Sequence, residues 1–599
     1  MKLSDYVIST LAAQGVRHVF LLTGGMAMHL NESLGRCPEI RYVCNLHEQA
    51  CAIAAEAYAK YDTHLGVAMV TAGPGATNAI TGVAGAWLDS SPALFLSGQV
   101  KKSDLMGESG LRNRGVQEVD IISLVRSITK HAVTITDPST IRYHLEKAIH
   151  LALSGRPGPV WLDIPLDVQA AEIQPDKLLG FRPEISNAVA VGSALQVQTA
   201  EVVRMLRHSE RPFVLFGNGV RLAGAQHSAE RLINTLGVPF GLTWPAMDLF
   251  PDSHPLLVGR PGPMAPRGAN FALQNSDFLL MVGARMDLVM TAFAPENLAR
   301  EASKVMVDID PAELAKFGGS LALSVCADAR DFLEELKAQS IDVNCSSRKD
   351  WLSRCAEWKV RYPLVQKKHR ETQDGVSMYF FTEVLSDALA EGDLIVPGSS
   401  GNAIETLLLA FRPKKNQRIF ITTGLGPMGF GLPASIGGCL AHGRKRTVCV
   451  DGDGGFQMNI QELETLARLR LPVKCFVINN GGYASMVASQ KNYFGHLVGA
   501  DPSSGVTLPD VTKVAAAYGI PTCRITNHAD LQSQISSILA SEGPMVVEVL
   551  ALADEAREPR VSSTRNADGS MSSKPLEDMW PFLDRKEFMA NMIVAPVNP

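Results

Sequence analysis

The sequence is short of several features that point to particular classes of protein. Its 599 residues contain no apolar run of the roughly 20 residues that a membrane-spanning helix needs. The formal net charge is −5, without long blocks of like charge, and so gives no sign of the basic patch that nucleic-acid binding favours. The N-terminus also lacks the long apolar core of a signal peptide. We therefore expect a cytoplasmic protein with neither a membrane nor a nucleic acid as partner.

Paired cysteines are missing as well. The ten cysteines are scattered singly and none forms a CxxC pair, which argues against a zinc site. Several lie inside apolar strand-like runs, such as Cys449 in TVCV and Cys475 in KCFVI. We expect these cysteines to be buried free thiols in a reducing compartment.

The chain is too long for one hydrophobic core, and three α/β blocks follow one another along it. In each block short apolar strands alternate with helical segments, which predicts βαβ units and parallel sheets. The predicted fold class is therefore α/β, with three doubly wound parallel-sheet domains and a C-terminal tail. The boundaries are 1–178, 190–342 and 370–550 for the domains and 551–599 for the tail, in which we expect one short helix and no strand. Residues 170–195 have the composition of a linker.

The first and third blocks share one feature. Each carries a glycine-rich turn between a strand and a helix, TAGPGATN at 71–78 and TTGLGPMGFG at 422–431. Two diverged copies of one α/β domain would explain this similarity.

The strongest motif is DGDGGFQMNIQELETLARLRLPVKCFVINN at 451–480. It predicts a strand, a helix and a second strand, and a right-handed crossover would bring Asp453 and Asn480 to the same carboxyl edge of the sheet. A carboxylate and an amide oxygen are hard ligands that suit Mg²⁺ bound to phosphate oxygens. Gly454 and Gly455 let backbone N–H groups approach those phosphates. A dinucleotide site would instead need GxGxxG, which GDGGFQ does not fit.

Together with other segments, this motif makes the chain resemble acetolactate synthase and its relatives over about residues 1 to 550. GDG and NN are separated by 24 residues, the spacing of the thiamine diphosphate signature. The other matching segments are HEQACAIAAEAYAK (47–60), TAGPGATNAITGVAGAW (71–87), SGRPGPVWLDIPLDVQ (154–169), VDIDPAEL (307–314) and GPMGFGLPASIG (426–437). The resemblance implies a pyrimidine-binding domain, a central domain and a diphosphate-binding domain. It also implies thiamine diphosphate, Mg²⁺, and a homodimer or homotetramer with active sites between subunits.

The resemblance also implies roles for single residues. Glu48 takes the position of the catalytic glutamate, which in that family hydrogen-bonds N1′ of the aminopyrimidine. Gln117 lies in the segment that faces the thiazolium, and His29 is a candidate acid, base or substrate contact, with a purely structural role as the alternative. The implied metal ligands are Asp453, Asn480 and the backbone carbonyl of Gly482. The implied cofactor contacts are Gly398, Ser399, Ser400, Gly426, Met428, Asp453, Gly454, Gly455, Asn480, Gly482, Tyr483, Ser485 and Met486.

Three segments depart from the acetolactate synthase pattern. The segment GGYASMVASQ after Asn480 is one residue longer, and is more similar to enzymes that act on cyclic diones and to synthase-like proteins of sugar gene clusters. Val116 replaces the aromatic residue before the Gln-Glu pair. In the central domain GARMDLVMTAF at 283–293 lacks an Asp and an Arg of the flavin-binding pattern, although Arg156 and Arg285 are kept. FAD, an adenine nucleotide and an empty site all stay open there.

The function that the resemblance implies is carboligation. A 2-oxo acid, with pyruvate as the first candidate, would lose CO₂ and its acyl unit would be transferred to a second carbonyl. The alternatives are a non-oxidative 2-oxo acid decarboxylase or cyclic dione hydrolase with the same cofactor, and a catalytically silent regulatory paralogue. The intact Glu48, Asp453 and Asn480 argue against the silent paralogue, which has no chemical need for all three. The acceptor is left open between a second 2-oxo acid, an aldehyde, a ketone and a keto-sugar.

Overall fold

The computed structural model describes residues 1–183, 189–340, 343, 348–372, 374–399, 401–565 and 568–597. The chain forms two compact units. The first comprises Met1–Ile185, Asp393–Ile404 and Arg418–Ala553, and the second comprises Ser186–Gly392, Glu405–Gln417 and Asp554–Pro599. Part of the predicted linker (184–188), the predicted end of the central domain at residue 342, Cys345 and the candidate cofactor contact Ser400 lie outside the described residues.

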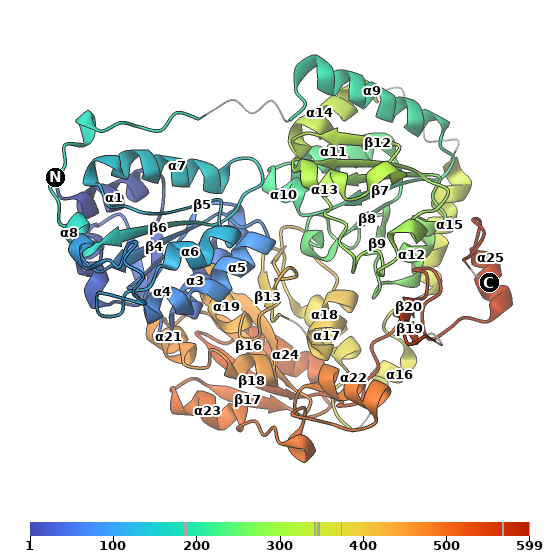
Figure 1. Cartoon of the computed structure of the whole chain (residues 1–599). Coiled ribbons are helices and arrows are strands. Elements are labelled where there is room, and N and C mark those ends of the chain that lie inside the picture. The colour runs from blue at the N-terminus through green and yellow to red at the C-terminus, as the bar shows by residue number, and fades with distance from the viewer. Residues whose placement is uncertain are drawn as a thin grey trace. The chain divides into compact units, whose positions relative to one another are not determined.

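The first unit contains two parallel six-stranded sheets, of which the N-terminal one has the order β2-β1-β3-β4-β6-β5. Its strands β4, β5 and β6 are labelled in Figure 1. Its strands are β1 (His18–Leu21), β2 (Arg41–Cys44), β3 (Gly66–Val70), β4 (Ala93–Gln99), β5 (His131–Thr134) and β6 (Val160–Pro165). Its helices are α1 (Leu3–Ala13), α2 (Met28–Arg36), α3 (Glu48–Asp62), α4 (Pro74–Asn78), α5 (Ile80–Leu88), α6 (Ile121–Val125), α7 (Ile141–Leu153) and α8 (Leu166–Gln169).

The other sheet of this unit has the order β14-β13-β15-β16-β18-β17. Its strands are β13 (Leu394–Pro397), β14 (Arg418–Ile419), β15 (Thr447–Gly452), β16 (Val473–Asn479), β17 (Thr522–Ile525) and β18 (Met545–Leu550). Its helices are α19 (Gly431–Ala441), α20 (Asp453–Gln457), α21 (Glu462–Leu469), α22 (Ala484–Phe494), α23 (Val511–Ala517) and α24 (Leu531–Ala540).

The two sheets have the same strand order once their strands are numbered along the chain, which supports two diverged copies of one domain. The pairing of the two glycine-rich turns proposed from the sequence is nevertheless wrong. The turn at 422–431 follows β14, the equivalent of β2, and so corresponds to the turn that leads into Glu48. The turn at 71–78 follows β3 and corresponds to the GDGG turn after β15. Helices α3 and α19 are therefore the equivalent helices of the two copies.

Helix α3 is an alanine-rich helix buried on nearly all sides, which requires small residues on its neighbours. A Cβ atom at Gly437 of α19 would lie 2.0 Å from the carbonyl oxygen of Ala54. A Cβ atom at Gly82 of α5 would lie 2.4 Å from the Cβ of Ala52. Because glycine alone permits this approach, α3 packs closely between α5 and α19 in one core.

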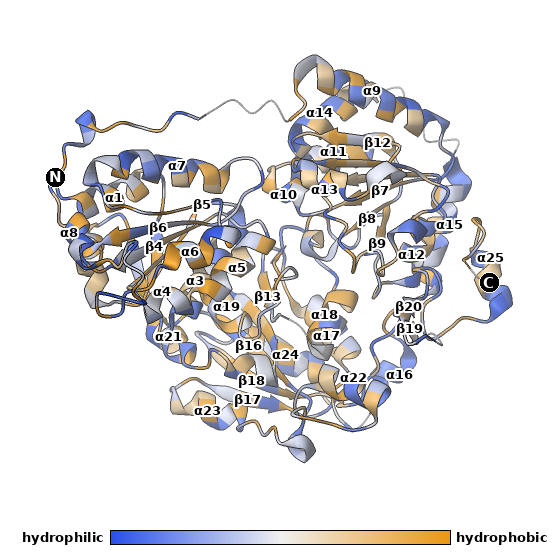
Figure 2. Cartoon of the chain, in the orientation of Figure 1, coloured by the Kyte–Doolittle hydropathy of each residue, from blue (hydrophilic) through white to orange (hydrophobic). Residues whose placement is uncertain are grey.

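The second unit holds a third parallel sheet, with the order β12-β11-β10-β7-β8-β9 that is common in nucleotide-binding α/β folds. Its strands are β7 (Pro212–Phe216), β8 (Phe240–Leu242), β9 (Leu257–Gly259), β10 (Phe278–Val282), β11 (Ser303–Asp308) and β12 (Leu323–Cys326). Its helices are α9 (Gly192–His208), α10 (Gly219–Leu222), α11 (Gln226–Leu236), α12 (Arg267–Gln274), α13 (Pro311–Ala315) and α14 (Ala329–Gln339). The hydrophilic and hydrophobic colours along α9 in Figure 2 reflect its one buried face, formed by residues such as Leu195, Val202 and Leu206.

Helices α15 (Lys349–Arg361) and α16 (Lys367–Arg370) follow, and then α17 (Met378–Ala388) and α18 (Asn402–Ala410). The prediction for the last fifty residues is partly wrong. The predicted helix is α25 (Arg585–Asn591), but β19 (Ser563–Arg565) and β20 (Met571–Ser573) also form an antiparallel pair. These strands are too short and too polar to be recognised from alternation.

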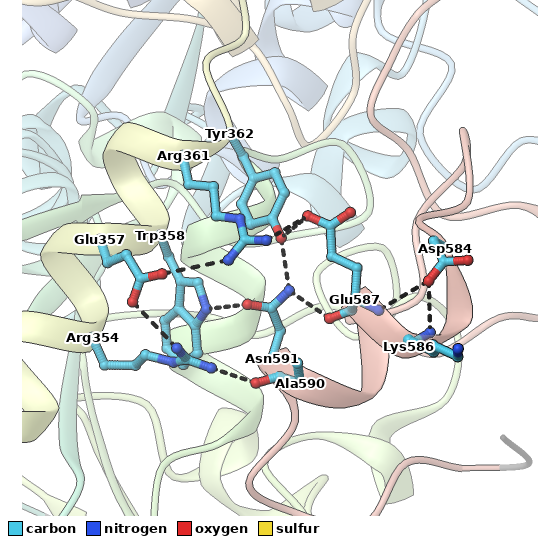
Figure 3. A network of polar contacts seen from close by, with 10 residues as sticks. All are labelled: Arg354, Glu357, Trp358, Arg361, Tyr362, Asp584, Lys586, Glu587, Ala590 and Asn591. Carbon is cyan, nitrogen blue, oxygen red and sulfur yellow. Dashed lines mark hydrogen bonds and ion pairs between the residues drawn. The ribbon is translucent and has the colours of Figure 1, made fainter.

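The C-terminal segment is packed against the rest of the second unit. The side chain of Asn591 accepts a hydrogen bond from the Trp358 indole at 2.7 Å and donates one to the Tyr362 hydroxyl at 2.7 Å (Figure 3). Phe588 belongs to the same hydrophobic core as Trp358, and the buried Glu577 forms an ion pair with Arg300 at 2.9 Å. The segment is therefore an integral part of this unit.

The predicted fold class is confirmed, because each of the three α/β blocks forms a six-stranded parallel sheet with flanking helices. The apolar runs around Cys449 and Cys475 form the inner strands β15 and β16. Over the residues that are described, none of the helices has both the length and the apolar character that crossing a membrane requires. The described cysteines are free thiols, and Cys51, Cys355, Cys439, Cys449 and Cys475 are buried.

Candidate functional site

The glycine-rich turn at 71–78 is the centre of one group of candidate residues. Glu48 begins α3 and is 7% exposed, in keeping with the apolar run that follows it. Its carboxylate accepts a hydrogen bond from the Asn78 side chain at 3.0 Å. A Cβ atom at Gly75 would lie 3.4 Å from the same carboxylate, so Glu48 lies directly against the turn. Asn78 was not singled out from the sequence, although it lies inside the quoted motif.

Two further candidates border the same turn. Gln117 is exposed and has a positive φ of 64°, and a Cβ atom at Gly73 would lie 2.4 Å from its carbonyl oxygen. His29 is half-buried in the first turn of α2. The turn before α2 touches the same region, because a Cβ atom at Gly24 would lie 2.4 Å from the Thr71 side chain. The fold thus brings the three predicted catalytic segments together around residues 71–78.

The second group lies at the carboxyl ends of the neighbouring strands β15 and β16. Asp453 follows β15 and is 3% exposed. Its carboxylate accepts hydrogen bonds from the backbone N–H groups of Gly454 at 2.8 Å and Gly482 at 3.1 Å. Burial raises the pKa of Asp453 to about 6, and these backbone donors act in the opposite direction.

Asn480 follows β16, and its side-chain oxygen is buried without a hydrogen-bond partner among the described residues. A buried oxygen without a partner costs free energy unless a ligand completes it. No three His, Cys, Asp or Glu side chains in the described ranges cluster as metal ligands. A cation here would therefore rely on one carboxylate, an amide oxygen, a backbone oxygen and oxygens of its own ligand. This donor set fits Mg²⁺ bound to a diphosphate.

Glycines and large side chains meet beside Asp453. A Cβ atom at Gly454 would lie 2.3 Å from the Tyr483 ring and 3.3 Å from the terminal methyl group of Met428. Gly426 has a positive φ of 63°, and a Cβ atom there would lie 3.9 Å from the Ser399 carbonyl oxygen. The predicted cofactor contacts from four separate loops therefore converge.

Asp451 is a residue of this group that the sequence reasoning missed. It is 3% exposed, and burial raises its pKa to about 7. Cβ atoms at Gly398, Gly431 and Gly455 would lie 2.1, 2.4 and 2.4 Å from its carboxylate oxygens. Glycines of three separate segments thus pack against one carboxyl group. Its place directly before GDG was the only available signal.

The remaining candidate residues are Ser485 and Met486 after Asn480 and Arg285 in the central domain. The Ser485 hydroxyl is buried without a hydrogen-bond partner among the described residues, whereas Met486 is 47% exposed. In the central domain Arg285 forms an ion pair with Asp287 at 3.0 Å. Leu288 and Phe293, in the segment that departs from the flavin-binding pattern, are 59% and 66% exposed.

Three family models match the chain. The N-terminal TPP binding domain of thiamine pyrophosphate enzymes matches residues 1–124, the central domain matches 199–336 and the C-terminal TPP binding domain matches 400–549. The two groups of candidate residues lie within or beside the two TPP-binding models. The class of protein is therefore that of the thiamine pyrophosphate enzymes.

Individual relatives are similar over most of their length. The probable acetolactate synthase large subunit of Methanocaldococcus jannaschii is 32% identical over 567 residues, which are 92% of this chain and 92% of the relative. Acetolactate synthase 1, chloroplastic, of Nicotiana tabacum is 32% identical over 579 residues, 94% of this chain and 83% of the relative. The acetolactate synthase large subunit of Cyanidium caldarium is 30% identical over 566 residues, which are 93% of this chain and 94% of the relative. The chain belongs to the acetolactate synthase-like family of thiamine pyrophosphate enzymes.

Proposed function

We propose that this protein is a carboligase that decarboxylates a 2-oxo acid, with pyruvate as first candidate, and transfers the acyl unit to a second carbonyl. The observation that carries the proposal is the pair formed by the buried Asp453 carboxylate and the unpartnered Asn480 oxygen at adjacent strand ends. The names of the relatives, acetolactate synthases, favour the same reaction class.

The metal site proposed is a Mg²⁺ ion held by Asp453, Asn480 and the backbone carbonyl of Gly482. The Gly482 N–H group donates to Asp453 at 3.1 Å, so the backbone of residue 482 is already beside the carboxylate. Hard oxygen ligands of this kind suit Mg²⁺ and leave positions for the oxygens of a diphosphate. The start of α20 adds backbone N–H groups on the same side.

The residue proposed to work on the aminopyrimidine is Glu48. Its burial and its hydrogen bond from Asn78 fix one carboxylate oxygen and leave the other to hold or deliver a proton. Thiamine diphosphate, when bound, supplies a carbon nucleophile that adds to the 2-oxo acid and accepts the electron pair left by CO₂. Met428 and Tyr483, which lie over Gly454, would shape the space around it.

The fate of the acyl unit depends on whether an acid is held close to the reacting carbon. The sequence contains 14 histidines, and no two of them are neighbours in the sequence. Gln117 can orient a carbonyl group but is a poor acid, and His29 is the single histidine among the candidate residues. Slow protonation favours capture by an acceptor that the site holds in position, because positioning alone lowers a barrier by several kcal/mol. We therefore propose carboligation over release of an aldehyde, in a homodimer or homotetramer.

The test is product analysis by mass spectrometry. The protein is incubated with pyruvate, thiamine diphosphate and Mg²⁺, together with a panel of 2-oxo acids, aldehydes, ketones and keto-sugars. We expect mainly products with a new C–C bond for at least one acceptor, with acetaldehyde as a minor product. Acetaldehyde as the main product with every acceptor would support the decarboxylase alternative instead.

A further inference from the structure

Lys60 is a buried cation in the last turn of α3. Its side chain is 10% exposed, and its Nζ atom lies 2.8 Å from the Glu56 carboxylate and 2.7 Å from the Asp89 carboxylate. It also donates to the carbonyl oxygen of Ile421 at 2.9 Å. Lys60 therefore donates hydrogen bonds to Asp89 and to Ile421 and forms an ion pair with Glu56.

The charges of this cluster can balance. Burial raises the pKa of Glu56 to about 7, with the charge of Asp89 acting in the same direction and Lys60 opposing both. Burial alone would lower the pKa of Lys60, but the Asp89 and Glu56 carboxylates raise it overall. With Glu56 protonated, one cation faces one anion, and no buried charge is left without a partner.

The same cluster fixes the segment that follows β14. The second carboxylate oxygen of Asp89 accepts a hydrogen bond from the Gly424 N–H group at 2.9 Å. A Cβ atom at Gly424 would lie 2.6 Å from the Leu88 Cβ, so this backbone is pressed onto the end of α5. Arg418 donates to the Tyr61 carbonyl oxygen at 2.9 Å, which attaches the start of the segment to the end of α3. Hydrogen bonds to Lys60, Asp89 and the Tyr61 carbonyl oxygen therefore hold residues 418–424 in place.

The loop that follows is anchored again at its other end. The side-chain amide of Asn459 donates to the Gly429 carbonyl oxygen at 2.8 Å and to the Gln49 side chain at 3.2 Å. Gln49 is the neighbour of Glu48 at the start of α3. The loop 424–429 is thus fixed at both ends. Asp89, which follows α5, holds Gly424. Asn459, which also contacts Gln49 of α3, holds Gly429.

We propose that Lys60 and Asp89 are positioning residues for this loop. They hold Gly426 and Met428 in the place where the aminopyrimidine ring is received, and they do not touch the cofactor themselves. This inference rests on the proposed function and on the family resemblance, which implies that Gly426 and Met428 receive that ring. The diphosphate end of the site, at Asp453 and Asn480, depends on β15 and β16 instead.

The difference between the two ends gives a selective test. In Lys60→Met, the dissociation constants of thiamine diphosphate and of inorganic diphosphate are measured by calorimetry with Mg²⁺. We expect thiamine diphosphate, which carries the pyrimidine, to bind about tenfold or more weakly, equivalent to loss of at least one hydrogen bond. Inorganic diphosphate, which reaches only the metal end, should bind as in the wild type.

Lys474→Met is the matched control. Lys474 is 1% exposed and donates to the backbone carbonyls of Ser541 at 2.7 Å and Gly543 at 2.6 Å, at the end of β16 remote from Asn480. This substitution removes a buried lysine of the same unit but leaves the contacts of the loop 424–429 unchanged. Both ligands should therefore bind as in the wild type. Asp89→Asn is the second test variant for the case that Lys60→Met does not fold. Its amide can still accept from Gly424 but carries no charge, so we expect a smaller selective loss.

Equal weakening of both ligands in Lys60→Met and Asp89→Asn, or no change in either, would overturn the positioning role and leave the proposed function standing. The same selective loss in Lys474→Met would overturn it too. A wild-type protein that binds neither ligand would overturn the proposed function, and this inference with it.

Discussion

Glu48 and Glu56 lie two turns apart on one buried helix, yet their surroundings give them different roles. Glu48 faces the turn at 71–78, whereas Glu56 lies beside Lys60 and against Gly85 of α5. At the N-terminal end of α3, one carboxylate is thus available to a ligand. In the middle of the helix, the other is enclosed.

Glu48→Gln tests the catalytic assignment. The amide keeps the size of the side chain but cannot exchange a carboxyl proton, so we expect intact folding and a loss of about 10²- to 10⁴-fold in pyruvate turnover. The exposed Glu464→Gln serves as control and should be fully active. Deuterium exchange at C2 of the bound thiazolium, followed by NMR, should slow in parallel. Exchange at the wild-type rate in Glu48→Gln would remove Glu48 from this role.

Glu56→Gln tests the enclosed carboxylate through pH. The pKa of Glu56 in the folded protein, about 7, lies above the 4.5 of an ordinary glutamate. The stability that a protonated Glu56 contributes is complete below about pH 4.5 and is lost as pH rises through about 7. The amide is neutral throughout, so the variant should gain stability relative to the wild type between about pH 5 and pH 8. Urea unfolding midpoints of both proteins across this range measure the gain, and a constant difference would contradict it.

The positions of single residues were predictable where a motif fixes them locally. Asp453 and Asn480 lie where the strand–helix–strand pattern predicts, because parallel strands end at one edge of a sheet. Lys60, Asp89 and Asn459 could not be found in this way. Their contacts join segments far apart in the chain, such as Lys60 and Ile421 at a separation of 361 residues.

At the scale of elements, the contact between α3 and α19 depends on glycine. A methyl group at Gly437 would overlap the backbone of Ala54, which no side-chain rotation can relieve. We expect Gly437→Ala to lower the free energy of unfolding by about 1–3 kcal/mol or more. Chemical denaturation measures the effect.

Gly35→Ala is the matched control for that substitution. Gly35 lies near the end of α2, is exposed, and a Cβ atom there would meet nothing within 4 Å. Alanine should raise the free energy of unfolding by up to about 1 kcal/mol, because glycine is a poor helix former. Equal effects of the two substitutions would show that α3 and α19 are not closely packed.

Asn591→Ala tests whether the C-terminal helix is part of the second unit. The substitution leaves the buried Trp358 indole N–H without its acceptor (Figure 3), which costs about 1–3 kcal/mol. We expect faster hydrogen exchange in α25 and earlier proteolysis of the C-terminal segment. Lys586→Ala, at an exposed position of the same helix, should change neither. Unaltered exchange in Asn591→Ala would mean that the helix is held by other contacts.

The strands at the sheet edges carry a weaker sequence signal than the inner strands. β2 and β5 flank the first sheet, and β14 and β17 flank the corresponding sheet of the third block. The inner strands are buried on both faces and appear as continuous apolar runs. An edge strand such as β5, HAVT, is only half-buried at every position, and so carries no such signal.

At the scale of the whole molecule, the candidate residues are distributed over the two duplicated sheets. Glu48 follows β2 and lies against the turn after β3, whereas Gly426 and Met428 follow β14 and Asp453 follows β15. The two copies of one domain thus carry different candidate residues. The motifs predicted both groups of residues, but the equivalence of the two domains was visible only in the strand order.

The proposed metal site at Asp453 and Asn480 is tested most directly by measuring how cofactor binding depends on the metal. Calorimetry would measure the binding of thiamine diphosphate to the wild type with Mg²⁺, to the wild type with a chelator, and to Asp453→Ala with Mg²⁺. We expect tight binding only in the first case, because Asp453 and Asn480 are proposed to reach the diphosphate through the cation. Tight binding without metal, or undiminished binding in a folded Asp453→Ala, would contradict it.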